Sequence, residues 1–226
     1  MVATQKRVNG MQLAVGMVNW LATLLVTPHA LPRMDFSEGL PNQARTLVVV
    51  PTLLTSAENI EELVEALEVR FLANRDSHLH FGLLTDFEDA AAETVPEDEP
   101  LLSIARKGIE NLNEKYGREA SATEDGALGD TFFLFHRPRR WNSQERIWMG
   151  YERKRGKLAD LNSLLRGGGS DRFSLVVGET AALSGVKYVI TLDTDTQLPR
   201  DWARHFVAVM AHPQNRARFA TVRARF

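Results

Sequence analysis

Short apolar runs alternate along this sequence with longer segments of helical periodicity, and this alternation restricts the folds open to the chain. Runs that are almost entirely apolar lie at 46–50, 132–135 and 188–190, and another strand-like segment begins at His80. A strand that is apolar on both faces is typical of a parallel sheet covered by helices. We therefore predict an α/β fold with a mostly parallel sheet and flanking helices.

The intervening segments carry apolar stripes at helical spacing. In the first segment, Thr55 and Glu58 have the spacing of a capping box and predict where the helix begins. The stripe that follows comprises Ile60, Leu63, Val64, Leu67 and Phe71. A second stripe runs from Leu102 to Tyr116, and further helices are predicted from about Arg155 and over 199–213.

Ligands of open α/β sheets bind beyond the carboxyl ends of the strands, so the residues just past each strand are the candidates for a site. These residues are Pro51 and Thr52, Asp86, His136 and Arg137, and the segment Asp193–Asp195. Acids and cations therefore converge on one edge of the predicted sheet.

Asp193 and Asp195 are one residue apart at the end of a strand, and both can face the same ligand if the chain turns there. Hard carboxylate oxygens suit Mg²⁺ or Mn²⁺, and substrate phosphates usually complete the shell of such an ion. The pair therefore indicates a metal-bound diphosphate. The alternative is a solvated turn, in which aspartate is common.

The segment YERKRGKLADLN places Arg153, Lys154, Arg155 and Lys157 at a predicted helix start. A helix N-terminus favours anions, and so many cations there are best explained by an anionic partner. The alternative is a solvated basic face. Together with the acids, this segment predicts a phosphate-bearing ligand, such as a nucleotide, held with a divalent metal.

Other residues near this edge are given structural roles. We predict core packing for Trp141 and Trp148, with stacking on a base or sugar as the alternative, and a structural role for His136. The formal net charge of −2 does not indicate a nucleic-acid partner. The absence of cysteine excludes disulfides and thiolate chemistry.

The N-terminal segment 11–26 is apolar apart from three polar residues and follows Lys6 and Arg7. It is shorter than the roughly 20 residues that a bilayer span needs. Two interpretations stay open: an amphipathic or buried helix, and the end of a membrane helix. The segment 31–43 is rich in Pro, Gly and polar residues and is predicted to be a connector.

Several stretches, taken in order, resemble the glycosyltransferase domain of cyclic β-1,2-glucan synthases, glycosyltransferase family 84. They include RTLVVVPTLLTS, HFGLLTDFEDA, FFLFHRPRRWN, WMGYERKRGKLADLN and YVITLDTDTQLPRD, and the similarity runs over about 31–218. The resemblance implies a GT-A-like (Rossmann-like) nucleotide-sugar fold, a hexosyltransferase with UDP-glucose as donor and a growing glucan as acceptor, and Mg²⁺ or Mn²⁺.

The resemblance also assigns roles to single residues. Asp193 and Asp195 match the metal-binding DxD motif, and Asp86 matches the acid that contacts the uracil. Lys154 and Gly156, with Lys157, look like the residues beside the donor diphosphate. Thr52 follows the first strand, where the uridine usually packs.

Family members are large proteins of the bacterial inner membrane with this domain on the cytoplasmic side, and they carry their general base further downstream. We therefore expect an incomplete sheet, a donor-binding half-site and no catalytic base in this chain. The expected organisation is an apolar segment and connector at 1–43, a nucleotide-sugar-binding domain at 44–218 and a divergent tail at 219–226.

Two alternatives compete with this interpretation. LDTDT matches the haloacid-dehalogenase phosphatase pattern, with Asp193 as nucleophile and Asp195 as general acid and base. That motif normally lies on an early strand, whereas here it lies near the end of the sequence. The second alternative is an inactive, non-enzymatic remnant.

Overall fold

The computed structural model describes residues 2–26, 30–120 and 129–216, with backbone only for 2–11 and 118–120. The chain separates into two units, Met1–Pro32 and Arg33–Phe226. The predicted boundary at 43/44 lies within the second unit, because Leu40 is buried in its core and the Met34 N–H donates to the Ala208 carbonyl. The predicted tail at 219–226 lies outside the described residues.

The first unit is one helix, α1 (Val2–Leu25), which begins well before the apolar run at 11–26. Its described side chains, from position 12 onward, are exposed, including Leu13 and Trp20. Within the described part of the chain, no helix is both long and apolar enough to cross a bilayer.

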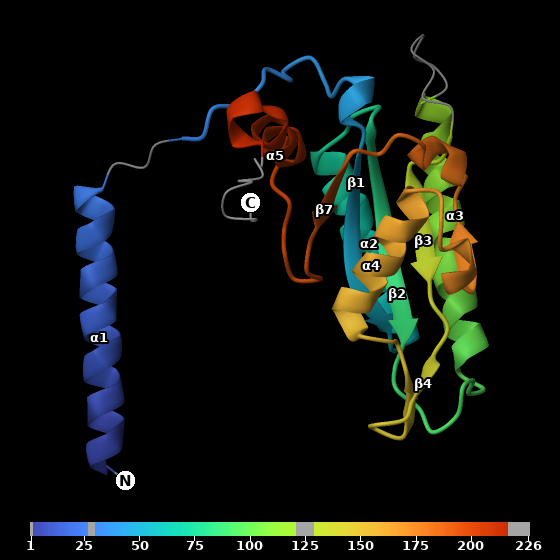
Figure 1. Cartoon of the computed structure of the whole chain (residues 1–226), viewed down its shortest axis with the longest axis horizontal. Helices are drawn as coiled ribbons and strands as arrows, with labels where there is room; N and C mark the ends of the chain where they lie inside the picture. Colours follow the sequence, from blue (N-terminus) through green and yellow to red (C-terminus); the bar gives the residue numbers. More distant parts are fainter. Residues whose placement is uncertain (1, 27–29, 121–128, 217–226) are drawn as a thin grey trace, which may run out of the picture. The chain divides into compact units, whose positions relative to one another are not determined.

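The second unit is built on a five-stranded sheet in the order β6-β3-β2-β1-β7 (Figure 1). Neighbouring strands are parallel except at β6, which runs antiparallel to β3. The strands are β1 (Thr46–Leu54), β2 (Leu79–Phe87), β3 (Phe132–His136), β6 (Leu175–Val177) and β7 (Tyr188–Thr191). The predicted α/β fold with a mostly parallel sheet is thus confirmed, and it is consistent with a Rossmann-like GT-A fold.

Helices cover both faces of the sheet. On one face, α2 (Ala57–Ala73), α3 (Asp98–Ala120) and α5 (Trp202–Ala211) bury their apolar stripes against β1, β2 and β3. On the other face, α4 (Arg153–Leu165) packs Leu161 against Leu47 and Phe135. The same cluster includes Phe173, which follows the short 3-10 helix η2 (Ser170–Arg172), and residues of the 3-10 helix η3 (Thr180–Leu183). Two further 3-10 turns, η1 (Asn42–Ala44) and η4 (Pro213–Asn215), flank β1 and α5. Strands apolar on both faces are therefore explained by burial on both faces.

Two local predictions were wrong. The N-cap of α2 is Ser56, whose hydroxyl accepts from the Asn59 N–H, and not Thr55. The stretch after β3, where the sequence predicts no strand, forms a small antiparallel hairpin of β4 (Arg140–Asn142) and β5 (Ile147–Met149). Backbone hydrogen bonds between Ala90 and Trp148 attach the hairpin to the loop after β2.

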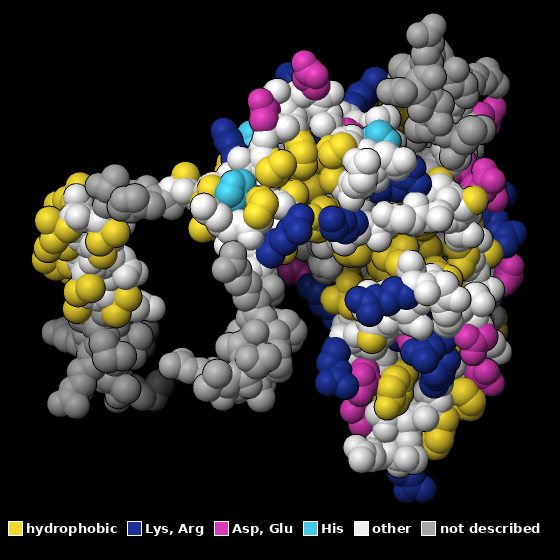
Figure 2. Space-filling view, turned by 45° about the horizontal axis from the view of Figure 1, so that its top comes forward, with side chains coloured by type: hydrophobic (Ala, Val, Ile, Leu, Met, Phe, Trp, Pro, Cys, Tyr) yellow, Lys and Arg dark blue, Asp and Glu magenta, His cyan; other side chains and the backbone are white. Residues whose placement is uncertain are grey.

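The strand β7 also differs from expectation. Its sequence reads as a buried strand, but among the described residues it pairs with β1 alone and its residues alternate between half-buried and exposed. It is therefore an edge strand, with Val189 42% exposed. Over the face drawn in Figure 2, basic and acidic side chains are interspersed between apolar ones, in keeping with the small net charge of −2.

Candidate functional site

A cavity of about 420 Å³ lies at the carboxyl ends of β1 and β2. Four predicted site residues line it, namely Thr52, Asp86, Lys154 and Lys157. The other lining residues are Pro51, Leu53, Thr55, Asn59, Phe87, Asp89, Gly150, Arg153 and Thr194. The cavity thus lies at the sheet edge where ligands of such folds bind.

Asp86 is buried and surrounded by cations. Arg137 donates to it through Nε and Nη2, at 2.8 and 2.9 Å from the two carboxylate oxygens. Lys157 Nζ lies 3.2 Å from Oδ2. The contacts therefore hold the carboxylate in one orientation, since charge-assisted bidentate pairs are both strong and directional.

Lys157 connects Asp86 to the first strand, because its Nζ also donates to the Thr52 carbonyl oxygen at 2.5 Å. Burial lowers the pKa of Lys157, and the nearby Asp86 carboxylate opposes this shift. Lys157 is therefore not part of a solvated basic face, as one interpretation of its segment had it. It is a buried cation at the wall of the cavity.

Arg137 extends the buried network to α4. Its Nη1 donates to Asp160 Oδ2 at 2.7 Å, and the other Asp160 oxygen accepts from Arg172 at 2.6 Å. Burial lowers the pKa of Arg137, but the hydrogen bonds that it donates to Asp86 and Asp160 outweigh burial and raise the pKa overall. The network thus joins the ends of β2 and β3 to the first turns of α4 through paired charges.

His136 lies beside this network and is buried at the end of β3. Its Nδ1 is 2.8 Å from the Thr85 hydroxyl, and burial lowers its pKa to about 4. A neutral, buried ring in contact with the neighbouring strand fits the structural role predicted for it.

The end of β7 is arranged differently. Asp193 forms an ion pair with Lys154, and the two side chains are 64% and 49% exposed. Thr194 lines the same cavity, whereas Asp195 lines a separate hollow against α2. The structure thus brings Asp193 to the cavity through Lys154 but directs Asp195 to the neighbouring surface.

Arg70 of α2 holds the backbone of this acidic loop. Its Nη2 donates to the carbonyl oxygens of Thr194 and Thr196 at 2.8 and 2.9 Å. Because Arg70 engages only backbone atoms here, it occupies neither the Asp193 nor the Asp195 carboxylate, and the Asp193 carboxylate is paired with Lys154 instead.

Two glycines permit close approach around the cavity. A Cβ on Gly156 would lie 2.1 Å from the Tyr151 carbonyl oxygen, and one on Gly150 would lie 2.2 Å from Asp86 Oδ2. Gly156 does not line the cavity itself. Its absent side chain instead lets the first turn of α4 close onto the preceding loop, which positions Lys154 and Lys157.

The acidic residues only partly fit a metal ion. No group of three or more His, Asp or Glu side chains in the described segments is arranged to hold one. Protein sites for Mg²⁺ often supply one or two carboxylates and leave the rest of the shell to water and substrate phosphates. Asp193 is exposed and paired with Lys154. It fits a metal site in which one protein carboxylate binds the ion and a phosphate-bearing ligand completes the shell.

Sequence reasoning missed several parts of the site. Arg137 was noted at the sheet edge without a role, and Asp160, Arg70 and Gly150 were not considered. The spacing of Lys157 and Asp160, three residues apart on one helix, is a signal that they share a face. Arg70 gave no such signal, because its partners are carbonyl groups more than 120 residues away.

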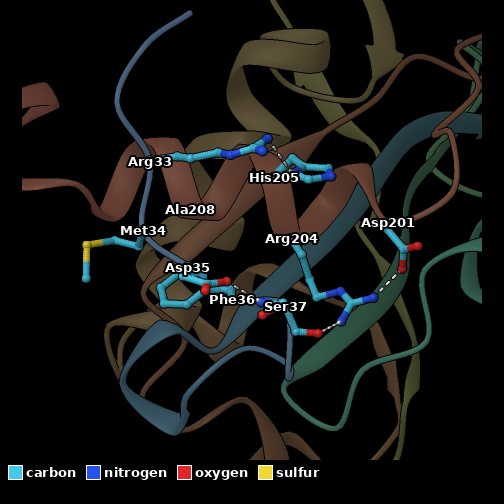
Figure 3. A pocket seen from close by; sticks show the side chains of 9 residues that line it. All are labelled: Arg33, Met34, Asp35, Phe36, Ser37, Asp201, Arg204, His205 and Ala208. Atoms are coloured by element: carbon cyan, nitrogen blue, oxygen red, sulfur yellow. Dashed lines mark hydrogen bonds and ion pairs between the residues drawn. The ribbon is translucent and has the colours of Figure 1, made fainter.

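A second hollow, of about 500 Å³, lies between the connector 33–37 and α5 (Figure 3). Its polar groups largely engage one another: Arg33 contacts His205 at 3.1 Å, and Arg204 donates to Asp201 and to the Ser37 carbonyl. None of the predicted site residues lines it. The hollow therefore offers little unsatisfied bonding capacity for a ligand.

No protein-family model matches the chain. A comparison with curated proteins found a match to the cyclic β-(1,2)-glucan synthase of Rhizobium meliloti, 42% identical over 204 residues. The chain is homologous to a segment of a cyclic β-(1,2)-glucan synthase. The match covers 90% of the chain, so the predicted site residues, which lie in its central part, fall within it. The predicted resemblance is thereby confirmed.

The chain spans only 7% of the length of that synthase. The homology supports a glycosyltransferase-related function, and it does not favour the phosphatase or the remnant interpretation of the DTDT segment.

Proposed function

We propose that the cavity at the carboxyl ends of β1 and β2 binds UDP-glucose together with Mg²⁺ or Mn²⁺. The chain would then be the donor-binding part of a hexosyltransferase that extends a β-1,2-glucan. The observation that carries this proposal is the cavity itself, where cations from α4 meet a buried acid of β2 and an exposed acid after β7. Its volume, about 420 Å³, lies in the range of small-molecule pockets.

The two ends of the cavity suit different parts of such a donor. Asp86 and Thr52 provide fixed polar groups for the uridine, while Lys154 provides a flexible cation for the diphosphate. Lys157, buried between Asp86 and Thr52, adds positive potential without being exposed to solvent. Gly156 keeps the start of α4 close enough for both lysines to reach this cavity.

Asp193, with Asp195 on the same loop, would hold the metal. A divalent ion bound there would neutralise the charge that develops on the departing diphosphate. Lys154 would exchange its ion pair with Asp193 for contacts to the diphosphate oxygens. The transfer also needs a base to deprotonate the acceptor hydroxyl, and no described residue is assigned that role.

The acceptor glucan, the inner-membrane location and the cytoplasmic orientation of this domain are proposed for the longer synthase. They rest on the resemblance of the sequence to that family. A contribution of α1 to membrane attachment belongs with the same proposal.

Isothermal titration of UDP-glucose into the chain, with and without Mn²⁺, tests the donor site. We expect binding that depends on Mn²⁺ in the wild type and is lost in Asp193→Ala. Asp171→Ala, at another exposed acid, is the matched control and should bind like the wild type. Absence of binding in a wild-type chain that melts cooperatively would contradict the proposal.

A further inference from the structure

The polar groups of the cavity differ in how far the protein itself satisfies them. Asp86 receives two hydrogen bonds from Arg137 and a contact at 3.2 Å from Lys157. A carboxylate offers about four acceptor positions, so most of those on Asp86 are occupied before any ligand arrives. Asp86 therefore has only a small part of its acceptor capacity left for the uridine.

Asn59, on the first turn of α2, is in the opposite state. Its side-chain Oδ1 is buried and has no hydrogen-bond partner in the described structure, and Asn59 lines the same cavity as Asp86. A buried acceptor without a partner is unfavourable, and such groups in native proteins call for an explanation. A role of that atom in binding a ligand provides one.

The local structure keeps Asn59 in this position. Its backbone N–H donates to the Ser56 hydroxyl at the N-cap, and the next residue, Ile60, is fully buried in the core. The side chain is therefore not needed to cap the helix. Asparagine is also a poor helix former, so its presence inside the first turn brings no gain in helix stability.

We propose that Asn59 is a specificity-determining residue that accepts a hydrogen bond from a hydroxyl group of the bound nucleotide sugar. This inference rests on the proposed function. A neutral amide oxygen is an acceptor, so it matches a hydroxyl and not a phosphate oxygen. The hydroxyl belongs either to the ribose or to the transferred hexose.

The test compares Asn59→Leu, which keeps the approximate size and removes the acceptor, with Glu61→Leu on the exposed side of the same helix. Each chain is titrated with UDP and with UDP-glucose in the presence of Mn²⁺. We expect Asn59→Leu to bind UDP-glucose about five- to tenfold more weakly than the wild type, a loss that corresponds to one net hydrogen bond. The control variant should bind UDP-glucose with the affinity of the wild type.

The two ligands distinguish the source of the hydroxyl. An equal loss for UDP and UDP-glucose assigns it to the ribose, and a loss for UDP-glucose alone assigns it to the hexose. Asn59→Asp retains acceptor oxygens and should bind within about threefold of the wild type, which also guards against a folding defect.

The outcomes separate this inference from the proposed function. Wild-type binding together with unchanged affinity in Asn59→Leu overturns the role of Asn59 and leaves the donor site standing. A loss of UDP-glucose affinity in Asn59→Asp that is as large as in Asn59→Leu overturns the role of Asn59 as well. Absence of binding in the wild type overturns both proposals.

Discussion

Two acids of the predicted site, Asp86 for the donor and Asp193 for the metal, lie in contrasting surroundings. Asp86, at the end of β2, is buried and paired with Arg137 and Lys157. Asp193, after the edge strand β7, is exposed and paired with Lys154. Both pairs join an acid at or just after the end of a strand to a basic side chain from elsewhere in the chain, but only the first is shielded from water.

This difference indicates which part of the site is formed before a ligand binds. A buried network is rigid and costly to disrupt, whereas an exposed pair contributes little to stability and rearranges easily. We infer that the β2 end provides a fixed wall, and that the β7 end is completed by the ligand. The predictions below test this contrast, from the largest expected effect to the smallest.

The largest effect is expected on the free energy of unfolding, when the basic partner of each pair is replaced by methionine. Arg137→Met leaves Asp86 and Asp160 buried with fewer partners and should lower the free energy of unfolding by about 3–5 kcal/mol. Lys154→Met removes the partner of an exposed acid and should change it by less than about 0.5 kcal/mol. Urea unfolding of both variants measures this, and equal effects would contradict the contrast.

A smaller effect is expected at the start of α4. In Gly156→Ala, the new methyl group would lie 2.1 Å from the Tyr151 carbonyl oxygen, so we expect a loss of about 1–3 kcal/mol. Gly117→Ala in α3 meets open space and should instead stabilise the protein, by up to about 1 kcal/mol. Thermal melting of both variants decides whether close packing at α4 is required.

The free energy of unfolding should fall in acid because of the buried histidines. Burial lowers the pKa of His136 to about 4, below its ordinary value of 6.5, so the unfolded chain binds more protons between these values. Stability is then fully present above pH 6.5 and falls as the pH drops toward 4, by at most about 1.4 kcal/mol per unit. His80, with a pKa of about 4, adds a similar contribution.

The check is the slope of unfolding free energy against pH from 6.5 to 5, in the wild type and in His136→Gln. The slope should be smaller in the variant, whatever its absolute stability. An identical slope would mean that His136 is accessible to protons in the folded state.

The smallest effect concerns the exposed pair. Lys154 and a divalent cation compete for the Asp193 carboxylate, so Lys154→Met should tighten Mn²⁺ binding in the absence of nucleotide by up to about fivefold. Titration of Mn²⁺ without nucleotide measures this change in affinity. Lys107→Met, on α3, is the control. Weaker Mn²⁺ binding in Lys154→Met would show that the two cations do not compete.

The sheet and its helices were predictable, because apolar periodicity depends only on neighbouring residues along the chain. The stripe from Ile60 to Phe71 faces the core as predicted, with Val64 half-buried and the other four residues buried. The exposure of β7 was not predictable, since its sequence resembles a buried strand and its edge position depends on which strands pair. Trp141, expected in the core, is 50% exposed for the same reason: it lies on a hairpin that only tertiary contacts define.

The site was predicted in part. Thr52, Asp86, Lys154 and Lys157 do line one cavity, because parallel strands bring their carboxyl ends to one edge. The partners that fix them were not foreseen: Arg137 reaches Asp160 across 23 residues, and Arg70 holds a loop 124 residues away. Such contacts depend on the path of the chain in space, and no spacing in the sequence encodes them. The metal and donor assignments stay predictions.

The edge strand β7 has a consequence for how this protein behaves at high concentration. A strand with one unpaired side offers free N–H and C=O groups to any strand that approaches it. Exposed Val189 on the strand and Phe206 on α5 add apolar surface to the same unit. Reversible self-association, and not unfolding, is then the first process that crowding would promote, so melting temperatures compared between variants need to be independent of protein concentration.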